Sequence, residues 1–444
     1  MKSIWSESCV FPERESLKED IVVDAAVIGG GMAGLLTAYL LKKQGMQVVV
    51  LEGSVTAGGV TKNTTAKITS QHDLIYDQLI QKFGVEQAAQ YAWANQRAIK
   101  AYRDIVEEDQ IDCDFETKPA FVYSLRDGES IEAETVAASK LGIVAEFTTS
   151  TDLPFEVKAA VKFENQAQFN PLKFLKAISA DLEIYEHTMV REVRDDVVIT
   201  DRGRVTADHI VVATHFPIIN IPGWYFARMH QERSYVIALK HAAQVNGMYI
   251  DEDPNGYSFR NYGEYLLFGG AGHRTGKHPQ AGSYELLRRA AGAFYPEREE
   301  VSHWSAQDCV TWDSVPYIGR YSASTPNLYV ATGFKKWGMT SAMASAMILT
   351  DYIRGKKNDT AEIFSPQRFN ASASMKNLLT DVGHSIAGLA AGAVSGPSRR
   401  CAHLGCRLQW NPDEETWDCP CHGSRYTDKG ELIDNPAKKG IAHE

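Results

Sequence analysis

The chain begins with apolar runs separated by a helical pattern. Residues 22–28 form a nearly continuous apolar run, which is typical of a strand buried on both faces. Apolar positions with helical spacing then extend from Met32 to about Gln44, and a second apolar run, residues 47–51, ends on Glu52. This order predicts a strand, a helix and a second strand, as found at the start of an α/β domain.

Two later segments have a related pattern. The run DHIVVAT, residues 208–214, ends in a turn of small residues, which is typical of a returning strand in flavoproteins with two dinucleotide folds. Residues 328–331 form another short apolar run, and a glycine-bracketed loop joins it to a long helical pattern from about Met339 to Ile353. These segments predict further strands and a helix of the same α/β domain.

Length and charge exclude several classes of protein. A chain of 444 residues is long for one core, so we expect two or three domains. A formal net charge of -10 without a lysine and arginine cluster argues against a nucleic-acid partner. The N-terminus lacks the pattern of a secretory signal, and the longest run of small apolar residues, 386–394, is shorter than the roughly 20 residues of a membrane helix. We therefore expect a cytoplasmic protein without a membrane span.

The first strand and helix enclose a glycine motif with the spacing that a dinucleotide needs. Gly29, Gly31 and Gly34 satisfy the G-x-G-x-x-G pattern at the end of the strand. The first glycine makes the turn, the second lets the backbone approach the pyrophosphate, and the third lets the helix pack on the strand. Met32 and Ala33 begin the helix, whose N-terminus would face the phosphates. Glu52 ends the second strand, where an acid would accept hydrogen bonds from the ribose hydroxyls.

The late segment distinguishes a flavin from a nicotinamide cofactor. The isoalloxazine ring lies far from the adenosine, and a helix N-terminus near that ring can stabilise negative charge on its reduced form. The alternative is one more strand-helix unit without a cofactor. Read as a flavin site, the return strand and the late segment contribute the following residues: Thr214, Gly333, Phe334, Lys335, Gly338, Met339 and Thr340.

The C-terminal tail contains two short Cys-His pairs. Cys401 and His403 are separated by one residue, and Cys419 and His422 by two. Such pairs, each on its own loop, can grip a metal centre from two sides. A tetrahedral zinc site with two cysteines and two histidines is one interpretation. Two further cysteines interleave with the pairs in CAHLGC and CPCHGS, which favours an iron-sulfur motif over a zinc finger.

Several stretches of the chain are specific in combination. They are VDAAVIGGGMAGLLTAYLL, TKNTTAKITSQHDLIYDQL, NQAQFNPLKFL, VPYIGR and ATGFKKWGMTSA. Together they resemble the D-amino-acid oxidase, or glycine oxidase, superfamily of FAD enzymes. With the tail included, the chain resembles more closely a bacterial branch of FAD-dependent oxidoreductases that carry a C-terminal Rieske 2Fe-2S domain. The resemblance covers roughly residues 15 to 365 and the tail.

The resemblance implies an α/β (α+β) architecture in which a two-dinucleotide FAD fold carries an inserted α+β substrate domain and a small all-β Rieske domain. Such Rieske domains usually rest on a larger β-sheet, so this one is expected to be shortened, with residues 378–394 packing it against the body. The expected divisions are an N-terminal extension (1–20), an oxidoreductase body (21–365), a linker (366–397) and the Rieske domain (398–444). Within the body, FAD-binding segments are 21–72, 166–219 and 301–360, and substrate segments are 73–165 and 220–300.

The resemblance also implies roles for individual residues. The segment after Glu52 would wrap the flavin, and Val190 would meet the adenine through its backbone. In the Rieske motif, two cysteines hold one iron, two histidines hold the other, and a disulfide joins the loops. The residues implied are Thr61, Lys62, Asn63, Thr64 and Thr65 for FAD, Cys401, His403, Cys419 and His422 for the cluster, Cys406 and Cys421 for the disulfide, and Ser424 and Tyr426 as hydroxyl donors to sulfur.

An amine or amino acid is the substrate that the resemblance implies. In this superfamily the flavin removes a hydride from the carbon next to a neutral amine, and a cation holds the substrate carboxylate. Lys336 stands where that cation is expected, although a lysine is a point charge without the bidentate geometry of arginine. Other candidates from the substrate segments are Arg260, Tyr257, Tyr262, His273 and Arg274.

Three functions fit these cofactors. The first is a dehydrogenase that passes electrons singly through the cluster to an external protein or quinone. The second is a peroxide-forming oxidase with a structural or redox-sensing metal tail. The third is a redox-partner module that feeds a separate oxygenase. A one-electron cluster favours the first, because a two-electron oxidase needs no such relay.

Overall fold

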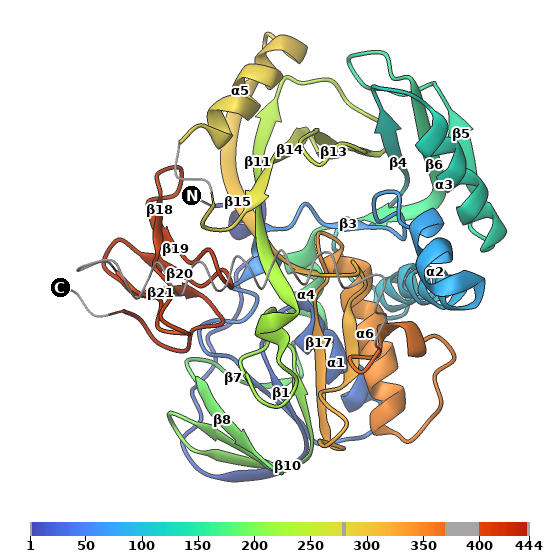
Figure 1. Cartoon of the computed structure of the whole chain (residues 1–444). Coiled ribbons are helices and arrows are strands. Elements are labelled where there is room, and N and C mark those ends of the chain that lie inside the picture. The colour runs from blue at the N-terminus through green and yellow to red at the C-terminus, as the bar shows by residue number, and fades with distance from the viewer. Residues whose placement is uncertain (1, 278–280, 369–398, 442–444) are drawn as a thin grey trace.

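The computed structural model describes residues 2–277, 281–368 and 399–441, and these residues form three β-sheets with helices around them (Figure 1). The residues predicted to pack the tail against the body, 378–394, lie outside the described residues. The described helices are α1 (Met32–Lys43), α2 (Tyr76–Glu108), α3 (Glu129–Lys140), α4 (Pro171–Ile178), α5 (Ser283–Phe294) and α6 (Gly338–Ile353). None of them is long and apolar enough to cross a membrane.

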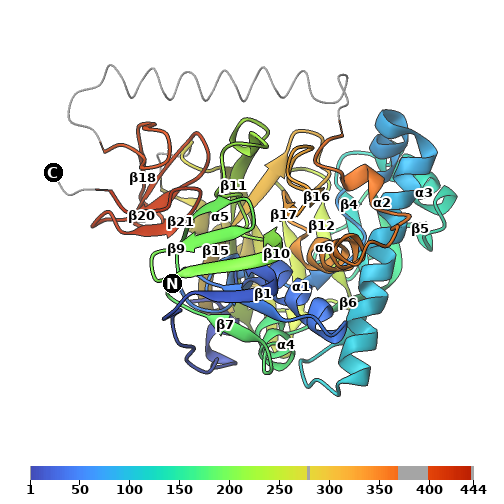
Figure 2. The ribbon, with the colours of Figure 1, turned by 90° about the horizontal axis from the view of Figure 1, so that it is seen from below.

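The first sheet has the parallel core that the opening pattern predicts. Its main strand order is β16-β17-β10-β1-β2-β7, and β1 pairs in parallel with both β10 and β2. The helices α1 and α6 pack against each other beside this sheet (Figure 2). Its strands are β1 (Ile21–Ile28), β2 (Val48–Leu51), β7 (Glu183–Tyr185), β8 (Val190–Arg194), β9 (Val197–Thr200), β10 (Arg204–Val212), β16 (Tyr317–Arg320) and β17 (Leu328–Thr332).

The second sheet carries the segments expected to bind substrate, and its main order is β15-β11-β14-β13-β12-β4-β6-β3. In Figure 1, α3 lies beside β5 and β6, α2 packs against α3, and α5 lies near β11 and β14. Its strands are β3 (Lys67–Ile68), β4 (Glu116–Ser124), β5 (Ala145–Thr148), β6 (Ala159–Gln168), β11 (Met229–Lys240), β12 (Met248–Asp251), β13 (Ser258–Tyr262), β14 (Tyr265–Arg274) and β15 (Glu299–Thr311).

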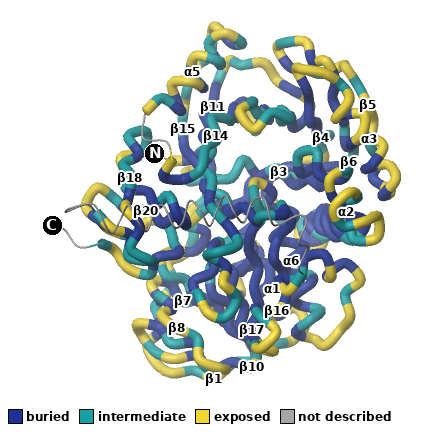
Figure 3. The backbone as a smooth tube through the Cα atoms, in the orientation of Figure 1, coloured by how far each residue is buried: buried dark blue, intermediate teal, exposed yellow. Residues whose placement is uncertain are grey.

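The third sheet belongs to residues 399–441, which we call the C-terminal unit. It is a small antiparallel meander, and its strands are β18 (Gln409–Asn411), β19 (Thr416–Asp418), β20 (Arg425–Thr427) and β21 (Leu432–Asp434). The cysteines and Tyr426 form its small core, so its interior is mostly sulfur and one aromatic ring. The unit rests against β11 and β15 of the body, where the tube in Figure 3 is mostly buried.

The start of the expected linker is attached to the body. Arg368, three residues into that segment, forms an ion pair with Asp313 at 2.9 Å, and both side chains are more than nine-tenths buried. The guanidinium also lies over the ring of Tyr317 at 4.2 Å. Residues 366–368 therefore pack on the body.

Candidate functional site

A cavity of about 890 Å³ extends from the glycine turn of the first sheet to the second sheet. That volume lies in the range of cofactor and ligand pockets. The lining includes the N-terminus of α1, the loop before α6, and the facing strands β11 and β15. Part of the wall comes from the C-terminal unit, through residues 432–435, 437 and 438. Segments from both ends of the chain therefore enclose one site.

The glycine turn has the geometry that a dinucleotide requires. Gly29 has a φ of +112°, and a Cβ there would stand 2.6 Å from the carbonyl oxygen of Ala213. A Cβ on Gly34 would stand 1.9 Å from the oxygen of Gly29. These close approaches leave room only for glycine, and they bring the N-terminus of α1 to the cavity, where its free N–H groups suit a pyrophosphate.

Glu52 lines the cavity beside the glycine turn. Its carboxylate accepts hydrogen bonds from the N–H groups of Gly30 and Ser54, each at 2.8 Å. Burial raises the pKa of this carboxyl, although the two hydrogen bonds oppose that shift. The acid is therefore held in a fixed orientation on the cavity wall. Its contact with a ribose stays a prediction.

The cavity brings most of the predicted cofactor residues together. Four predicted residues are absent from the lining: Gly34, Lys62, Gly333 and Thr340, the last of which donates to the carbonyl of Thr69 at 2.9 Å. Those that line the cavity are Gly29, Gly31, Met32, Ala33, Glu52, Thr61, Asn63, Thr64, Thr65, Val190, Thr214, Phe334, Lys335, Gly338 and Met339.

The loop before α6 is held by a partly buried ion pair and by a stacked ring pair. Lys335 has a φ of +52° and forms an ion pair with Asp73 at 2.6 Å. Trp337 stacks on His72 with ring centroids 4.9 Å apart. Burial lowers the pKa of that histidine to about 3, so the ring is neutral at physiological pH. These contacts attach the loop to residues 72 and 73, where a flavin ring is expected.

The structure separates the four catalytic candidates into two pairs. Tyr257 and Lys336 line the cavity. Arg260 is buried outside the lining and donates to the backbone carbonyls of Thr65 and Ala66, so its guanidinium supports the flavin loop. Tyr262, also outside the lining, donates to Asp114 at 2.7 Å. Neither side chain is part of the cavity lining, and a catalytic role for Arg260 or Tyr262 stays a prediction.

His273 and Arg274 are also absent from the cavity lining among the described residues. His273 instead meets the hydroxyl of Tyr235 at 3.0 Å. Sequence patterns did not indicate two acids that do line the cavity, Glu232 and Asp308. Successive side chains of a strand point to opposite faces of the sheet, and both acids lie on the face that lines the cavity. That position could be recognised only once the structure showed which face is inward.

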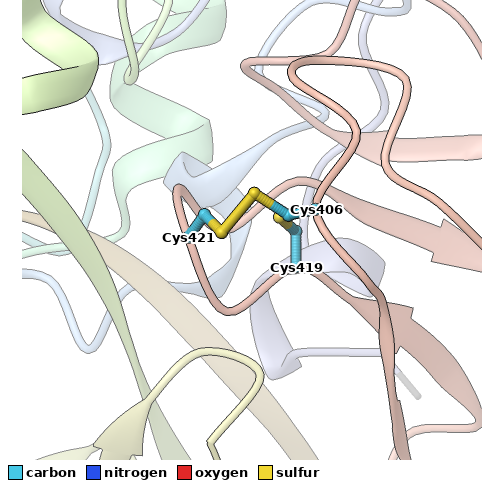
Figure 4. A group of neighbouring side chains, drawn as sticks. All are labelled: Cys406, Cys419 and Cys421. Carbon is cyan, nitrogen blue, oxygen red and sulfur yellow. A yellow bond between two sulfur atoms is a disulfide. The ribbon is translucent and has the colours of Figure 1, made fainter. Parts of the chain in front are cut away.

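The two loops of the C-terminal unit are joined by the predicted disulfide between Cys406 and Cys421 (Figure 4). The sulfur of Cys419 lies within 4.8 Å of both disulfide sulfurs. Because disulfide sulfurs do not carry the charge of thiolate ligands, this trio is not itself a metal set. The disulfide holds the loop of Cys419 beside the loop of Cys401.

The remaining four side chains fit a 2Fe-2S cluster. The hydrogen bond from Cys419 lowers the pKa of the Cys401 thiol, and Tyr426 reaches the same sulfur at 3.3 Å. The rings of His403 and His422 have centroids 5.0 Å apart. Burial lowers the pKa of His403 to about 4, and its Nδ1 is buried without a hydrogen-bond partner among the described residues. A neutral imidazole with a free nitrogen suits an iron ligand.

Strands β11 and β15 lie between the cavity and the loop of His422, and we call the pair the β11–β15 ribbon. Side chains alternate between its faces. On one face, the cross-strand pairs Glu232 with Asp308 and Ser234 with Ala306 line the cavity. The other face meets the C-terminal unit. One β-ribbon is thus the partition between the two candidate cofactor sites.

Buried amides join the outer face of the ribbon to the loop of His422. Gln231 donates to the carbonyl oxygen of His422 at 2.6 Å, and Gln307 donates to that of Gly423 at 2.9 Å. Gln307 also donates to the side chain of Gln231 at 2.7 Å. Both glutamines are at most 2% exposed. The ribbon therefore contacts the backbone of a predicted iron ligand directly.

Further contacts fix the orientation of the C-terminal unit. Arg233 forms a buried ion pair with Glu414. Asp413 accepts from the N–H groups of Gly282 and Ser283, at 2.9 and 3.0 Å, and so caps α5. Asn435 donates to the carbonyl oxygens that precede and follow His215 by one residue, at 2.6 and 2.7 Å. Complementary polar groups of the C-terminal unit and of the body therefore hold the unit in place.

Comparisons with known proteins agree with these two sites. Residues 24–352 match the family model described as FAD dependent oxidoreductase, DAO, and residues 382–443 match the Rieske [2Fe-2S] domain. A Bacillus subtilis (strain 168) protein, YhfW, whose name describes a Rieske 2Fe-2S iron-sulfur protein, is 37% identical over 99% of this chain and 97% of its own length.

Two further similarities concern the body. The gamma-glutamylputrescine oxidoreductase of Escherichia coli (strain K12) is 22% identical over 81% of this chain and 88% of its own length. The glycine oxidase structure from Geobacillus kaustophilus superposes with a TM-score of 0.67, at 17% identity, over 78% of this chain and 99% of that one. This chain therefore belongs to the DAO family of FAD-dependent oxidoreductases and carries a C-terminal Rieske domain, which together imply FAD and a 2Fe-2S cluster as its cofactors.

Proposed function

We propose that this enzyme oxidises an amine or amino acid at its C–N bond and passes the electrons singly, through the Rieske cluster, to an external acceptor. FAD would supply the chemistry of hydride acceptance. The names of the similar oxidoreductase and oxidase support a nitrogen-bearing substrate. The observation that carries the relay is the β11–β15 ribbon, because one strand pair contacts both the cavity and the His422 loop.

The chemistry of the two cofactors supports this direction of electron flow. A flavin collects two electrons, whereas a 2Fe-2S cluster carries one. Imidazole ligation places Rieske potentials between about -150 and +300 mV, well above the about -400 mV of plant-type ferredoxins. Such a cluster is an electron acceptor for a reduced flavin. An oxidase that gives both electrons to oxygen would not need it.

The docked geometry supports a relay inside one chain. Residues 432–435 of the C-terminal unit are part of the cavity wall. The unit therefore need not move toward the cavity before it receives an electron. Tertiary contacts hold it there, including the ion pair of Glu414 with Arg233 and the hydrogen bond from Asn435 to the carbonyl of Thr214. We therefore expect the rate of transfer from flavin to cluster to be independent of protein concentration.

The variant His403→Ala tests the relay. It removes one imidazole that would hold the cluster, while the FAD cavity keeps its lining. We expect the variant to retain FAD and to be bleached by an amine substrate at the parent rate under anaerobic conditions. Its turnover with ferricenium, a one-electron acceptor, should fall at least tenfold.

His241→Ala is the matched control, because that histidine is 66% exposed and remote from both sites. It should behave as the parent does. Turnover of His403→Ala at the parent rate with ferricenium and other one-electron acceptors would contradict the relay. Formation of one peroxide per substrate with oxygen, at equal rates in parent and variant, would instead support an oxidase with a structural tail.

A further inference from the structure

Glu232 and Asp308 form a carboxylate pair inside the cavity. They are direct partners in the antiparallel register of β11 and β15, and both belong to the cavity lining. Side chains that face each other across two strands have Cβ atoms about 4.5–5.5 Å apart, and like charges at that position are destabilising. A cation bound between the two acids would remove this repulsion.

The partners of the two acids differ. Glu232 meets Nε2 of His230 at 3.3 Å, and this contact lowers the pKa of its carboxyl, so Glu232 is charged at neutral pH. Asp308 has no hydrogen-bond or ion-pair partner for its carboxylate among the described residues. Burial, with a further contribution from Glu232, raises the pKa of Asp308 to about 7, although Lys336 and Arg233 oppose the shift. The pair therefore combines a permanent anion with a group that exchanges protons near neutrality.

Three cationic side chains lie near the pair, and one of them, Lys335, is already paired with Asp73 at 2.6 Å. Lys336 reaches the cavity from the loop before α6, and no ion pair within 4.0 Å joins it to either acid in the described chain. Arg233 points to the other face of the ribbon, where Glu414 neutralises it. Neither lysine therefore occupies the pair through an ion pair in the described residues.

The cavity lining offers fewer groups that could bind a substrate carboxylate than groups that could bind a cation. No arginine lines the cavity in the described parts of the chain, so the bidentate fork that suits a carboxylate is missing from this wall. Arg260, the arginine expected to serve, is held by backbone carbonyls outside the lining. Carboxylates also outnumber lysines along the cavity as a whole. This balance suits an amine better than an α-amino acid.

We infer that the Glu232–Asp308 pair binds the ammonium group of an amine substrate and that Asp308 accepts its proton. This inference rests on the proposed function and names the substrate class of the same cavity. In the proton step an N–H bond of the ammonium breaks and an O–H bond forms on the Asp308 carboxylate. The amine becomes neutral and keeps its lone pair, and no electron moves in this step. Only the neutral amine can then lose a hydride from its α-carbon, because the lone pair stabilises the positive charge that develops there.

The pair is tested first by ligand binding to the oxidised holoenzyme. Flavin difference spectra at pH 8 and constant ionic strength would be titrated with n-butylammonium chloride and with sodium butyrate, which have the same chain length and opposite charge. We expect butylammonium to bind at least tenfold more tightly than butyrate. Asp308→Asn and Glu232→Gln should each weaken butylammonium at least tenfold and leave butyrate unchanged or tighter.

Glu192→Gln is the control, because it removes a carboxylate that is 48% exposed and lies outside the cavity lining. It should change either affinity less than twofold. Tighter binding of butyrate than of butylammonium, or an unchanged butylammonium affinity in Asp308→Asn, would overturn the inference.

The proton step is tested by the pH dependence of anaerobic flavin reduction by butylamine, putrescine and benzylamine. In Asp308→Asn the rate should fall at least tenfold at pH 8 and recover as the pH approaches the pKa of the free amine. A variant with merely damaged structure would lose rate equally at all pH values, which would overturn the role of Asp308. Both tests read the flavin before any electron reaches the cluster, so the outcome with His403→Ala does not affect them.

Discussion

The substitution Glu414→Gln should loosen the Rieske domain from the body. Glu414 is 6% exposed and forms ion pairs with two arginines, Arg233 on β11 and Arg425 on β20, whose side chains are 1% and 8% exposed. Arg425 keeps Asp418 at 3.0 Å when Glu414 is lost, but Arg233 would lose its carboxylate and keep only neutral partners.

The expected loss follows from the buried charge that remains. Removing one partner of a buried ion pair costs about 3–5 kcal/mol, because the other charge stays uncompensated. At about 1.36 kcal/mol for each factor of ten, the docked state should lose roughly 150- to 5,000-fold in population against the open state. Arg233→Met should cost less than half as much, since Glu414 keeps Arg425. The double variant should be less destabilised than the sum of the two singles.

Hydrogen exchange on the holoprotein measures this loss strand by strand. Amides of β18–β21 and of the β11–β15 ribbon should exchange faster in Glu414→Gln, whereas those of β1 and β10 should keep their protection. Glu192→Gln is the control, because the side chains of Glu192 and Arg194 are 48% and 68% exposed, so water screens their ion pair and its loss should change protection very little. A loss in Glu414→Gln no larger than that of the control, or a larger loss in Arg233→Met, would refute the reasoning.

Three further predictions concern the two cofactor sites. Gly34→Ala should reduce the FAD content of purified protein below one tenth, since its Cβ would stand 1.9 Å from the oxygen of Gly29, whereas Gly128→Ala, with no neighbour nearer than 3.4 Å, should retain FAD. Tyr426→Phe should lower the cluster's reduction potential in a redox titration followed by EPR, because it removes a hydrogen bond to the sulfur of Cys401; an unchanged potential would count against that contact. Asp308 has a pKa raised to about 7 in the fold, so its contribution to stability declines as pH rises from about 4 to about 7. Asp308→Asn should therefore be more stable, relative to the parent, at pH 8 than at pH 5 in urea titrations, and an equal difference at both pH values would disagree with the raised pKa.

The sequence alone determined the cofactor-binding parts of this protein. The opening strand, helix and strand are β1, α1 and β2, and the glycine motif lies at their turn. Such signals are local: a buried strand, an amphipathic helix and a tight turn each impose a residue pattern within one short segment. The Cys-His pairs are equally local, because each loop brings its two ligands within a few residues. The cofactors could therefore be predicted before any contact was known.

Tertiary structure decided which side chains share the cavity. Arg260 looked like a substrate ligand, yet its guanidinium is held by the carbonyls of Thr65 and Ala66. Glu232 and Asp308 carry no local motif, and they meet only because β11 and β15 pair in one register. The C-terminal segment 432–438 forms part of the cavity wall only after the Rieske domain docks. Strand register and domain docking depend on contacts between residues far apart in the chain, and no short-range pattern encodes them.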